Sequence, residues 1–317
     1  MSQSKDEIID ISSWYSDEVA YQEGTLTKST WYAPPVDEFD FIIKNHRYLF
    51  KQGRDWAPWQ FWSEIVASII GEEIDVNVPA AYAAVNSDTM QEGVLIEWFY
   101  GYPGCPPVRY TSAEQWFTRI NPDFDTKKGI AHNLGDAATI CRSFAQQGFF
   151  VDQEWRVELF KHLVLDALVG NVDRHQNNWG FLWSKEEDRN VVRFAPAFDN
   201  GTSLGYEILD RKLGNFNDET HIQSYVAKGT HHMRFLRGSE NKPKHIELLS
   251  HYLERYKGLE ALESVIEKVI GLDLESLAYD LHVLTEYQMP TPLSEERVSF
   301  MLRLLKVRKE RISALLD

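Results

Sequence analysis

The chain has 317 residues, of which 43% are hydrophobic and 13% aromatic, so a disordered polypeptide is excluded and two lobes with a large core are expected. Its formal net charge of −15 argues against direct binding to nucleic acids and to anionic membranes, which carry the same sign of charge. Cys105 and Cys141 are the two cysteines, which are too few for a disulfide scaffold. No segment has the length and apolarity of a membrane span or a signal peptide. We therefore expect a cytoplasmic protein.

Short strands and one helix are predicted in the first hundred residues. Turn residues break up residues 14–50, and the aromatic-rich segment 39–51 predicts a hairpin that bends near Asn45. A helix is expected after Pro58, ending near Gly71, and a strand is expected over residues 92–100. The helix has an apolar stripe at helical spacing, made of Trp62, Ile65, Val66 and Ile69.

The Pro/Gly-rich segment 101–110 is the predicted boundary between an N-lobe, residues 1–100, and a C-lobe, residues 101–317. Residues 111–150 predict no clear element. A strong helix is expected over residues 154–169, with Gly170 as its end.

Two short strands are expected near residues 180–196, and the charged segment 206–245 predicts no regular structure. Residues 246–317 predict helices, the last of which begins after the capping residue Ser294. Strands with one helix, followed by a mainly helical part, predict an α+β chain in two lobes.

Polar residues gather on two turns of the predicted C-lobe. Asp173 and Asn178 lie five residues apart on the loop after the helix over residues 154–169, and Asp199 lies on a later turn. Mg²⁺ prefers carboxylate and amide oxygens, and phosphoryl transfer from ATP needs a carboxylate near the attacking hydroxyl. This pattern favours Asp173 as the residue that aligns the acceptor, with Asn178 and Asp199 as metal ligands. The alternative for any one of these residues is a capping or turn role.

The two stretches "GNVDRHQNNWG" and "FAPAFDNGTSLG" together resemble the HipA-like family of serine/threonine kinases, whose signature is N-x-D-R-H-x-x-N followed by D-x-G-x-S. The resemblance covers residues 20–205 and implies a protein-kinase-like fold, use of ATP and Mg²⁺, and Asp173 as the base. His175 is expected to brace the loop. The chain resembles the compact members of the family, so docking of an antitoxin-like partner, a property of longer members, stays open.

The resemblance also implies a nucleotide site in the first lobe. Lys51, at the end of a strand, and Glu64, on the following helix, match the phosphate-binding lysine and its carboxylate partner. Gly24 and Lys28 match a phosphate-covering loop, in which a hydroxyl is expected to be autophosphorylated. Backbone groups near Glu97 and Phe99 are expected to bind adenine. The alternative is that these features have no role in binding: Lys51 is then a solvated lysine and Glu64 a surface glutamate. The segment with Gly24 and Lys28 is then an ordinary turn, and the segment with Glu97 and Phe99 is a core strand.

Three functions remain open at this point. The first is an ATP- and Mg²⁺-dependent kinase that modifies a serine or threonine hydroxyl of an unidentified protein. The second is a small-molecule or phosphoinositide-type lipid kinase, since segment 206–245 holds basic residues such as Arg211, Lys212, Lys228, Arg234 and Arg237, although acidic residues lie between them. The third is a non-catalytic nucleotide-binding partner protein.

Overall fold

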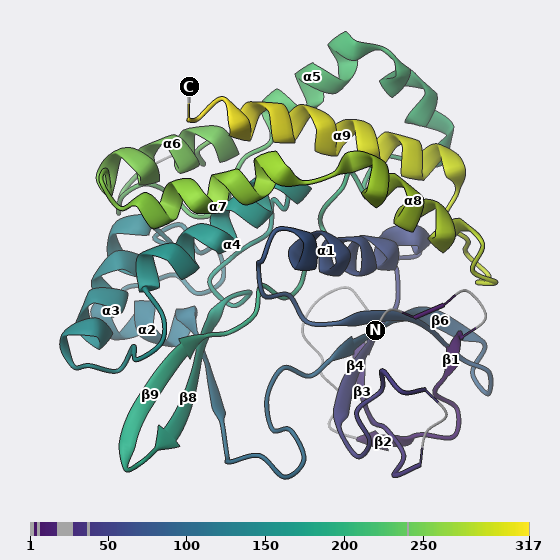
Figure 1. Cartoon of the computed structure of the whole chain (residues 1–317), viewed down its shortest axis with the longest axis horizontal. Coiled ribbons are helices and arrows are strands. Elements are labelled where there is room, and N and C mark those ends of the chain that lie inside the picture. Colours follow the sequence, from purple (N-terminus) through teal and green to yellow (C-terminus); the bar gives the residue numbers. More distant parts are fainter. Residues whose placement is uncertain (1–2, 5–6, 18–27, 37–38, 240, 317) are drawn as a thin grey trace.

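The computed structural model describes the chain except for residues 1–2, 5–6, 18–27, 37–38, 240 and 317 (Figure 1). The strands are β1 Ile9–Asp10, β2 Tyr15–Asp17, β3 Lys28–Tyr32, β4 Arg47–Lys51, β5 Ala81–Asn86, β6 Gln91–Glu97, β7 Arg109–Ser112, β8 Gly180–Glu186 and β9 Arg189–Phe194. The helices are α1 Trp62–Glu73, α2 Ala113–Ile120, α3 Leu134–Gln146, α4 Trp155–Val169, α5 Glu219–Lys228, α6 His245–Arg255, α7 Glu260–Gly271, α8 Leu274–Thr285 and α9 Glu295–Ser313, with 3₁₀ turns η1 Pro58–Phe61 and η2 Asp210–Asn217.

The first sheet has six strands in the order β1-β5-β6-β4-β3-β2, antiparallel except for the β1–β5 pair. Successive side chains of each strand point to opposite faces of the sheet, so the two faces carry different residues. On β5, Ala83 faces the core that contains α1, while Tyr82 and Ala84 face a second apolar cluster on the other side. The sheet is therefore buried on both faces, which fixes its register.

The predicted hairpin over residues 39–51 is wrong in its first half. Residues 40–45 form turns and bends, in which the Ile42 N–H donates to the Phe39 carbonyl. β4 takes β3 as its antiparallel partner instead. Ile42 is buried in the cluster on the outer face of the sheet, so the apolar run that suggested a strand arises from packing of a loop.

The other expected elements of the first hundred residues are present with shifted ends. α1 follows Pro58 through the turn η1 and continues to Glu73, two residues beyond the expected Gly71. The strand predicted over residues 92–100 is β6, which ends at Glu97. All of β1–β6 and α1 precede the boundary predicted at residue 100.

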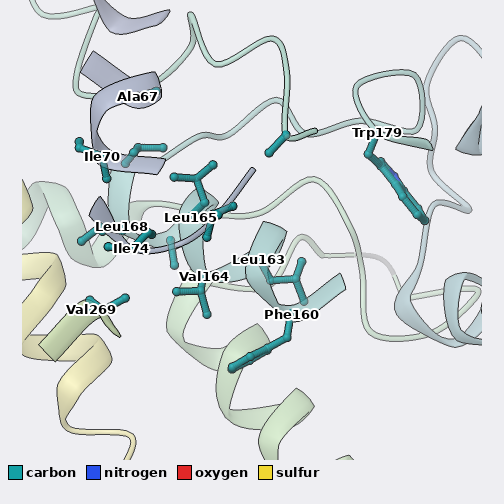
Figure 2. Close-up of a cluster of buried hydrophobic side chains, with 14 of the residues drawn as sticks. Ala67, Ile70, Ile74, Phe160, Leu163, Val164, Leu165, Leu168, Trp179 and Val269 are labelled. Atoms are coloured by element: carbon teal, nitrogen blue, oxygen red, sulfur yellow. The ribbon is translucent and has the colours of Figure 1, made fainter. Parts of the chain in front are cut away.

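α2–α4 and α6–α9 form one continuous core with α1 and the inner face of the first sheet. Figure 2 shows the centre of this core, where Ala67 and Ile70 of α1 lie beside Leu165 and Leu168 of α4 and Val269 of α7. α3, α6, α7 and α9 pack on α4, while α2 packs on α3 and α8 packs on α9. β7–β9 form a separate antiparallel sheet, which lies below these helices in Figure 1. The presence of two mainly antiparallel sheets together with these helices confirms the α+β class. No helix in the described part of the chain is both long enough and apolar enough to cross a lipid bilayer.

Segment 206–245 is more regular than the sequence suggested. It contains η2 and α5, which pack on α9 through a small cluster of Leu213, Ile222, Phe300, Leu304 and Val307. Residues 111–150, for which no element was predicted, contain α2 and α3. The predicted cap of the last helix is confirmed, since the Ser294 side chain accepts a hydrogen bond from the Arg297 N–H.

The connector between α8 and α9, residues 286–293, contacts the first sheet and α1. The Thr291 N–H donates to a carboxylate oxygen of Glu92 at 2.7 Å, and the Trp62 Nε1–H donates to the Thr291 carbonyl at 3.0 Å. The Tyr287 hydroxyl also donates to the Gln3 carbonyl. The C-terminal helices are thus attached to the first lobe at a point distant in sequence.

Gly170 ends α4 in the left-handed conformation, with φ of 71°. A Cβ at this position would lie 2.1 Å from Nη2 of Arg308, whose Nη1 donates to the Val169 carbonyl at 2.8 Å. We expect Gly170→Ala to lower the free energy of unfolding by more than the ~1–2 kcal/mol cost of a left-handed non-glycine residue, as measured by urea denaturation. Gly148→Ala is the matched control, because Gly148 also has φ of 71° but open space around its Cβ. Equal losses in both variants would contradict the role of the Arg308 contact.

Candidate active site

A cleft of about 370 Å³ lies between the first sheet and the loops after α4 and β9. Side chains from both sides of residue 100 line it. The structure brings into this one cleft every described residue that the sequence proposed for the site, namely Lys28, Lys51, Glu64, Glu97, Phe99, Asp173, Asn178 and Asp199. Gly24 lies outside the described residues.

Lys51 forms a buried cluster of charges with Glu64 and Asp199. β4 carries Lys51 and α1 carries Glu64, and their charged atoms are 2.5 Å apart with each side chain only 4% exposed. Lys51 also pairs with Asp199. Burial by itself would lower the pKa of Lys51, but the charges of Asp199 and Glu64 outweigh it and raise that pKa above its ordinary value. The ammonium group therefore stays charged.

Asp199 lies on a tight turn and faces two lysines. Its φ is 59°, and Lys28 Nζ on β3 is 3.6 Å from its second carboxylate oxygen. Burial would raise the pKa of Asp199, but Lys51 and Lys28 hold it well below its ordinary value. Gly201 follows, and a Cβ there would lie 3.1 Å from Glu64 and 3.2 Å from Lys51, so glycine makes room for this cluster.

Hydrogen bonds fix the backbone of the loop that carries Asp173. Its N–H donates to Asn171 Oδ1 at 2.9 Å, and its carbonyl accepts from the His175 N–H at 2.7 Å and from Asn178 Nδ2 at 2.9 Å. Because the Asn178 amide nitrogen is used in this way, its Oδ1 is the atom left for a metal ion. His175 Nδ1 accepts from the Asn177 N–H at 3.2 Å, so the imidazole braces the loop.

The Asp173 carboxyl group is partly buried and has charges of both signs near it. Burial raises its pKa, and the negative charge of Asp199 adds to this rise. The nearby charges of His175, Lys242 and Arg54 act in the opposite direction without cancelling it. A carboxylate with a raised pKa is a stronger base, which suits a group that accepts a proton.

Arg174 joins the two turns of the site, a role that the sequence did not reveal. Its guanidinium group contacts Asp166 of α4 at 2.8–3.1 Å, and it donates to the Asn178 carbonyl at 3.0 Å and to Asn200 Oδ1 at 2.6 Å. It also donates to the Phe198 carbonyl. Arg174 and Asp166 are fully buried. The arginine of the D-R-H stretch was the available signal, but its partners come from three segments, the farthest of them, Asn200, 26 residues away.

The same network reaches α1 and segment 206–245. The Asn200 N–H donates to Glu64 Oε2 at 2.8 Å, and His231 Nε2 lies 3.0 Å from Asp166 Oδ2. The Met233 N–H donates to His231 Nδ1, so the Nε2 atom carries the proton that is given to Asp166. A continuous line of hydrogen bonds therefore runs from Lys51 through Glu64, Asn200, Arg174 and Asp166 to His231.

The segment proposed to bind adenine already uses several of its backbone groups. The N–H groups of Glu97 and Trp98 donate to the carbonyls of Ala80 and Arg47, and the Trp98 carbonyl is bonded to His46. The Glu97 carboxylate accepts from the Tyr102 hydroxyl. The contact of the remaining backbone groups near Glu97 and Phe99 with adenine stays a prediction. The Phe99 ring lines the cleft and stacks on Phe198 with centroids 5.1 Å apart.

The donor set of the cleft fits a hard divalent cation that is shared with a phosphate. Asn178 and Asp199 offer amide and carboxylate oxygens, and Mg²⁺ is commonly bound by one or two such groups together with phosphate oxygens and water. Within the described residues, no group of three or more His, Cys, Asp or Glu side chains could enclose a metal by protein ligands alone. Arg54, Gln60, Asn177 and Thr202 also line the cleft but had no assigned role.

Comparison with known proteins places this geometry in a family. The sequence model of the HipA-like C-terminal domain matches residues 27–271. A stretch of 102 residues is 29% identical to the serine/threonine-protein kinase CtkA of Helicobacter pylori, which covers 31% of this chain and 30% of that protein.

Solved structures show the same fold over nearly the whole chain. The crystal structure of the Helicobacter pylori proinflammatory kinase CtkA matches with a TM-score of 0.71 at 17% identity, covering 98% of this chain and 96% of that one. HipA of Shewanella oneidensis MR-1, in its complex with HipB and operator DNA, matches with a TM-score of 0.52 at 13% identity, covering 95% and 66%. The two-lobed kinase-like fold is thereby confirmed. Because the family model spans most of its residues, the chain belongs to the HipA-like C-terminal domain family.

Proposed function

We propose that the protein is an ATP- and Mg²⁺-dependent kinase that transfers the γ-phosphoryl group to a serine or threonine hydroxyl of a protein. The observation that carries the proposal is the convergence of Lys51, Glu64, Asp173, Asn178 and Asp199 in one cleft. Membership of a family that includes relatives named as kinases supports it. A phosphotransferase needs this set of one ammonium group, metal-binding oxygens and a free carboxylate.

Each residue has a definite task in the proposed reaction. Lys51, oriented by Glu64, contacts the phosphates, and Lys28 adds a second positive charge beside them. Asn178 and Asp199 hold Mg²⁺, which neutralises phosphate charge when it is bound. Asp173 aligns the acceptor hydroxyl and takes its proton. The acceptor oxygen forms a bond to the γ-phosphorus while the bond from that phosphorus to the bridging oxygen of ADP breaks.

The proposals for partners and regulation rest on the family to which the chain belongs. We propose a cytoplasmic protein with a protein acceptor and an antitoxin-like partner; the HipA structure that resembles this chain contains HipB. Autophosphorylation is proposed for the segment around Lys28. Thr25 and Thr27 lie outside the described residues, and Ser29 and Thr30 lie on β3, where the Ser29 hydroxyl accepts a hydrogen bond from Trp31.

The metal role of Asp199 gives a direct test of the proposal. We expect Asp199→Asn to lower transfer of labelled γ-phosphate by at least ~100-fold and to raise the Mg²⁺ concentration for half-maximal activity, because the loss of one carboxylate charge weakens metal binding. Transfer is measured to a general protein acceptor, and intact mass reports any phosphate added to the chain itself.

Asp188→Asn is the matched control for this change. Asp188 has a similar left-handed backbone, with φ of 65°, on an exposed turn between β8 and β9. We expect it to keep full activity. Full transfer by Asp199→Asn at ordinary Mg²⁺ concentration would refute the metal role, and no transfer by the wild-type chain to any acceptor would refute the proposed function.

A further inference from the structure

Two positively charged side chains, one from each side of residue 100, lie near enough to Asp173 for their charges to act on it. Arg54 follows β4 in the first lobe and lines the cleft, while Lys242 precedes α6 in the second lobe. The charges of both act on Asp173. These two cations are distinct from Lys28 and Lys51, which are paired with Asp199 and Glu64 deeper in the cleft.

Arg54 lies against aromatic rings, and no carboxylate of the described residues forms an ion pair with it. Its guanidinium group lies 5.8 Å from the ring of Trp56 and 5.7 Å from the ring of Tyr206, which belongs to the second lobe. Its Nε atom is buried without a hydrogen-bond partner in the part of the chain that the structure describes. Stacking on rings orients a guanidinium group and leaves its donors available for an anion.

Arg234 adds a buried positive charge next to Lys242. Arg234 is only 7% exposed, and its contact with a protein acceptor is a long one, 3.5 Å to the Gly129 carbonyl. Its Nε atom has no partner among the described residues, and burial lowers its pKa with no carboxylate to oppose the effect. Burying a charge without a counterion is costly, so such a group is typical of a site that receives an anion.

The surroundings of Asp173 therefore carry an excess of positive charge in a chain whose formal net charge is −15. Arg54, Lys242 and Arg234 supply three positive charges beside the carboxylate of Asp173, and the other carboxylate that acts on Asp173, Asp199, is already paired with Lys51 and Lys28. We propose that Arg54 and Lys242, supported by Arg234, form a subsite that binds acidic side chains on either side of the acceptor hydroxyl. The substrate is then an acidic segment of a protein. This inference rests on the proposed kinase function.

An acidic peptide fits these observations better than a lipid headgroup. A phosphoinositide would present its phosphates on an extended anionic membrane, which a protein of net charge −15 meets with its whole acidic surface, whereas a peptide brings only a few negative charges into the cleft. The other Lys and Arg residues of segment 206–245 do not add to the subsite. Arg237 is paired with Asp136 at 3.0 Å, Lys244 Nζ donates to the Lys228 carbonyl, and Arg211, Lys212 and Lys228 lie on η2 and α5.

Matched peptides test the subsite. One peptide carries a serine flanked on each side by two glutamates, and its partner carries glutamines in their place. We expect the wild-type chain to phosphorylate the acidic peptide with a kcat/KM about 5- to 10-fold higher than that of the neutral peptide. Arg54→Gln and Lys242→Gln are each expected to reduce this ratio, and Lys242→Glu is expected to bring it to one or below. Lys228→Gln, on α5, is the control that keeps the ratio.

Binding is measured separately from catalysis. The fluorescently labelled acidic peptide, with alanine replacing its serine, is titrated with each variant at low and high salt. Tighter binding of the acidic peptide by the wild-type chain, weakened by Lys242→Glu and by salt, supports the subsite even if no phosphate transfer occurs, in which case only the kinase proposal fails. Equal use and equal binding of both peptides by an active enzyme overturns the subsite and leaves the kinase proposal standing. Binding to phosphoinositide vesicles but to neither peptide overturns it in favour of a lipid.

Discussion

Replacing Asp173 by asparagine is expected to lower phosphate transfer by about 10²- to 10⁴-fold, the usual contribution of a positioned general base. The amide keeps the size of the side chain but cannot accept the proton of the acceptor hydroxyl. The loop should keep its shape, since Asn171, His175 and Asn178 bond to the Asp173 backbone and not to its side chain. Transfer of labelled γ-phosphate is the measurement.

A measurement of ATP binding shows whether the Asp173→Asn variant has lost only its catalytic activity or also its fold. Asp173→Asn should bind ATP with an affinity within a few-fold of the wild-type chain, because the proposed phosphate ligands Lys28 and Lys51 are unchanged. The free energy of unfolding should also be preserved, since the carboxylate is only partly buried. Full transfer by the variant would show that Asp173 is not the base.

Replacing Arg174 by methionine is expected to have the largest effect on stability, about 3–5 kcal/mol of the free energy of unfolding, because it leaves the Asp166 carboxylate buried without its main cation. Asp166 is fully buried, and Arg174 holds its pKa well below the ordinary value against the opposing effect of burial. The measurement is urea denaturation followed by tryptophan fluorescence.

Two variants make this expectation specific. The double variant Asp166→Asn with Arg174→Met removes both charges and should lose less stability than Arg174→Met alone. Arg193→Met removes a guanidinium group with two carboxylate partners on the surface, Glu186 and Asp152, and should cost no more than about 1 kcal/mol. A loss below that value for Arg174→Met would contradict the central role of this arginine.

The sequence predicted best the parts of the molecule that depend on local patterns. α4 and α9 follow from apolar spacing with Gly170 and Ser294 at their ends, and β8 and β9 follow from short apolar runs. Asp173, Asn178 and Asp199 were recognised as members of two linked motifs, and the structure places them in the same cleft.

The remaining features depend on contacts between distant residues. The apolar segment 39–46 is a loop because β4 pairs with β3, and that pairing could not be read from the segment itself. Arg174 was visible in the motif, yet its role rests on Asp166, Asn200 and two backbone carbonyls that only the fold brings together. Arg54 and Lys242 are ordinary basic residues until the two lobes place them beside Asp173.

The attachment of residues 286–293 to Glu92 and Trp62 limits how the cleft can open. The first lobe is joined to the rest of the chain both after β6 and through this distant clamp. Because α1 also shares one core with α4 and α7, the back of the cleft is held by packing as well as by these hydrogen bonds, and we expect the two lobes to move little relative to one another there. The C-terminal helices would then preserve the width of the cleft without lining it.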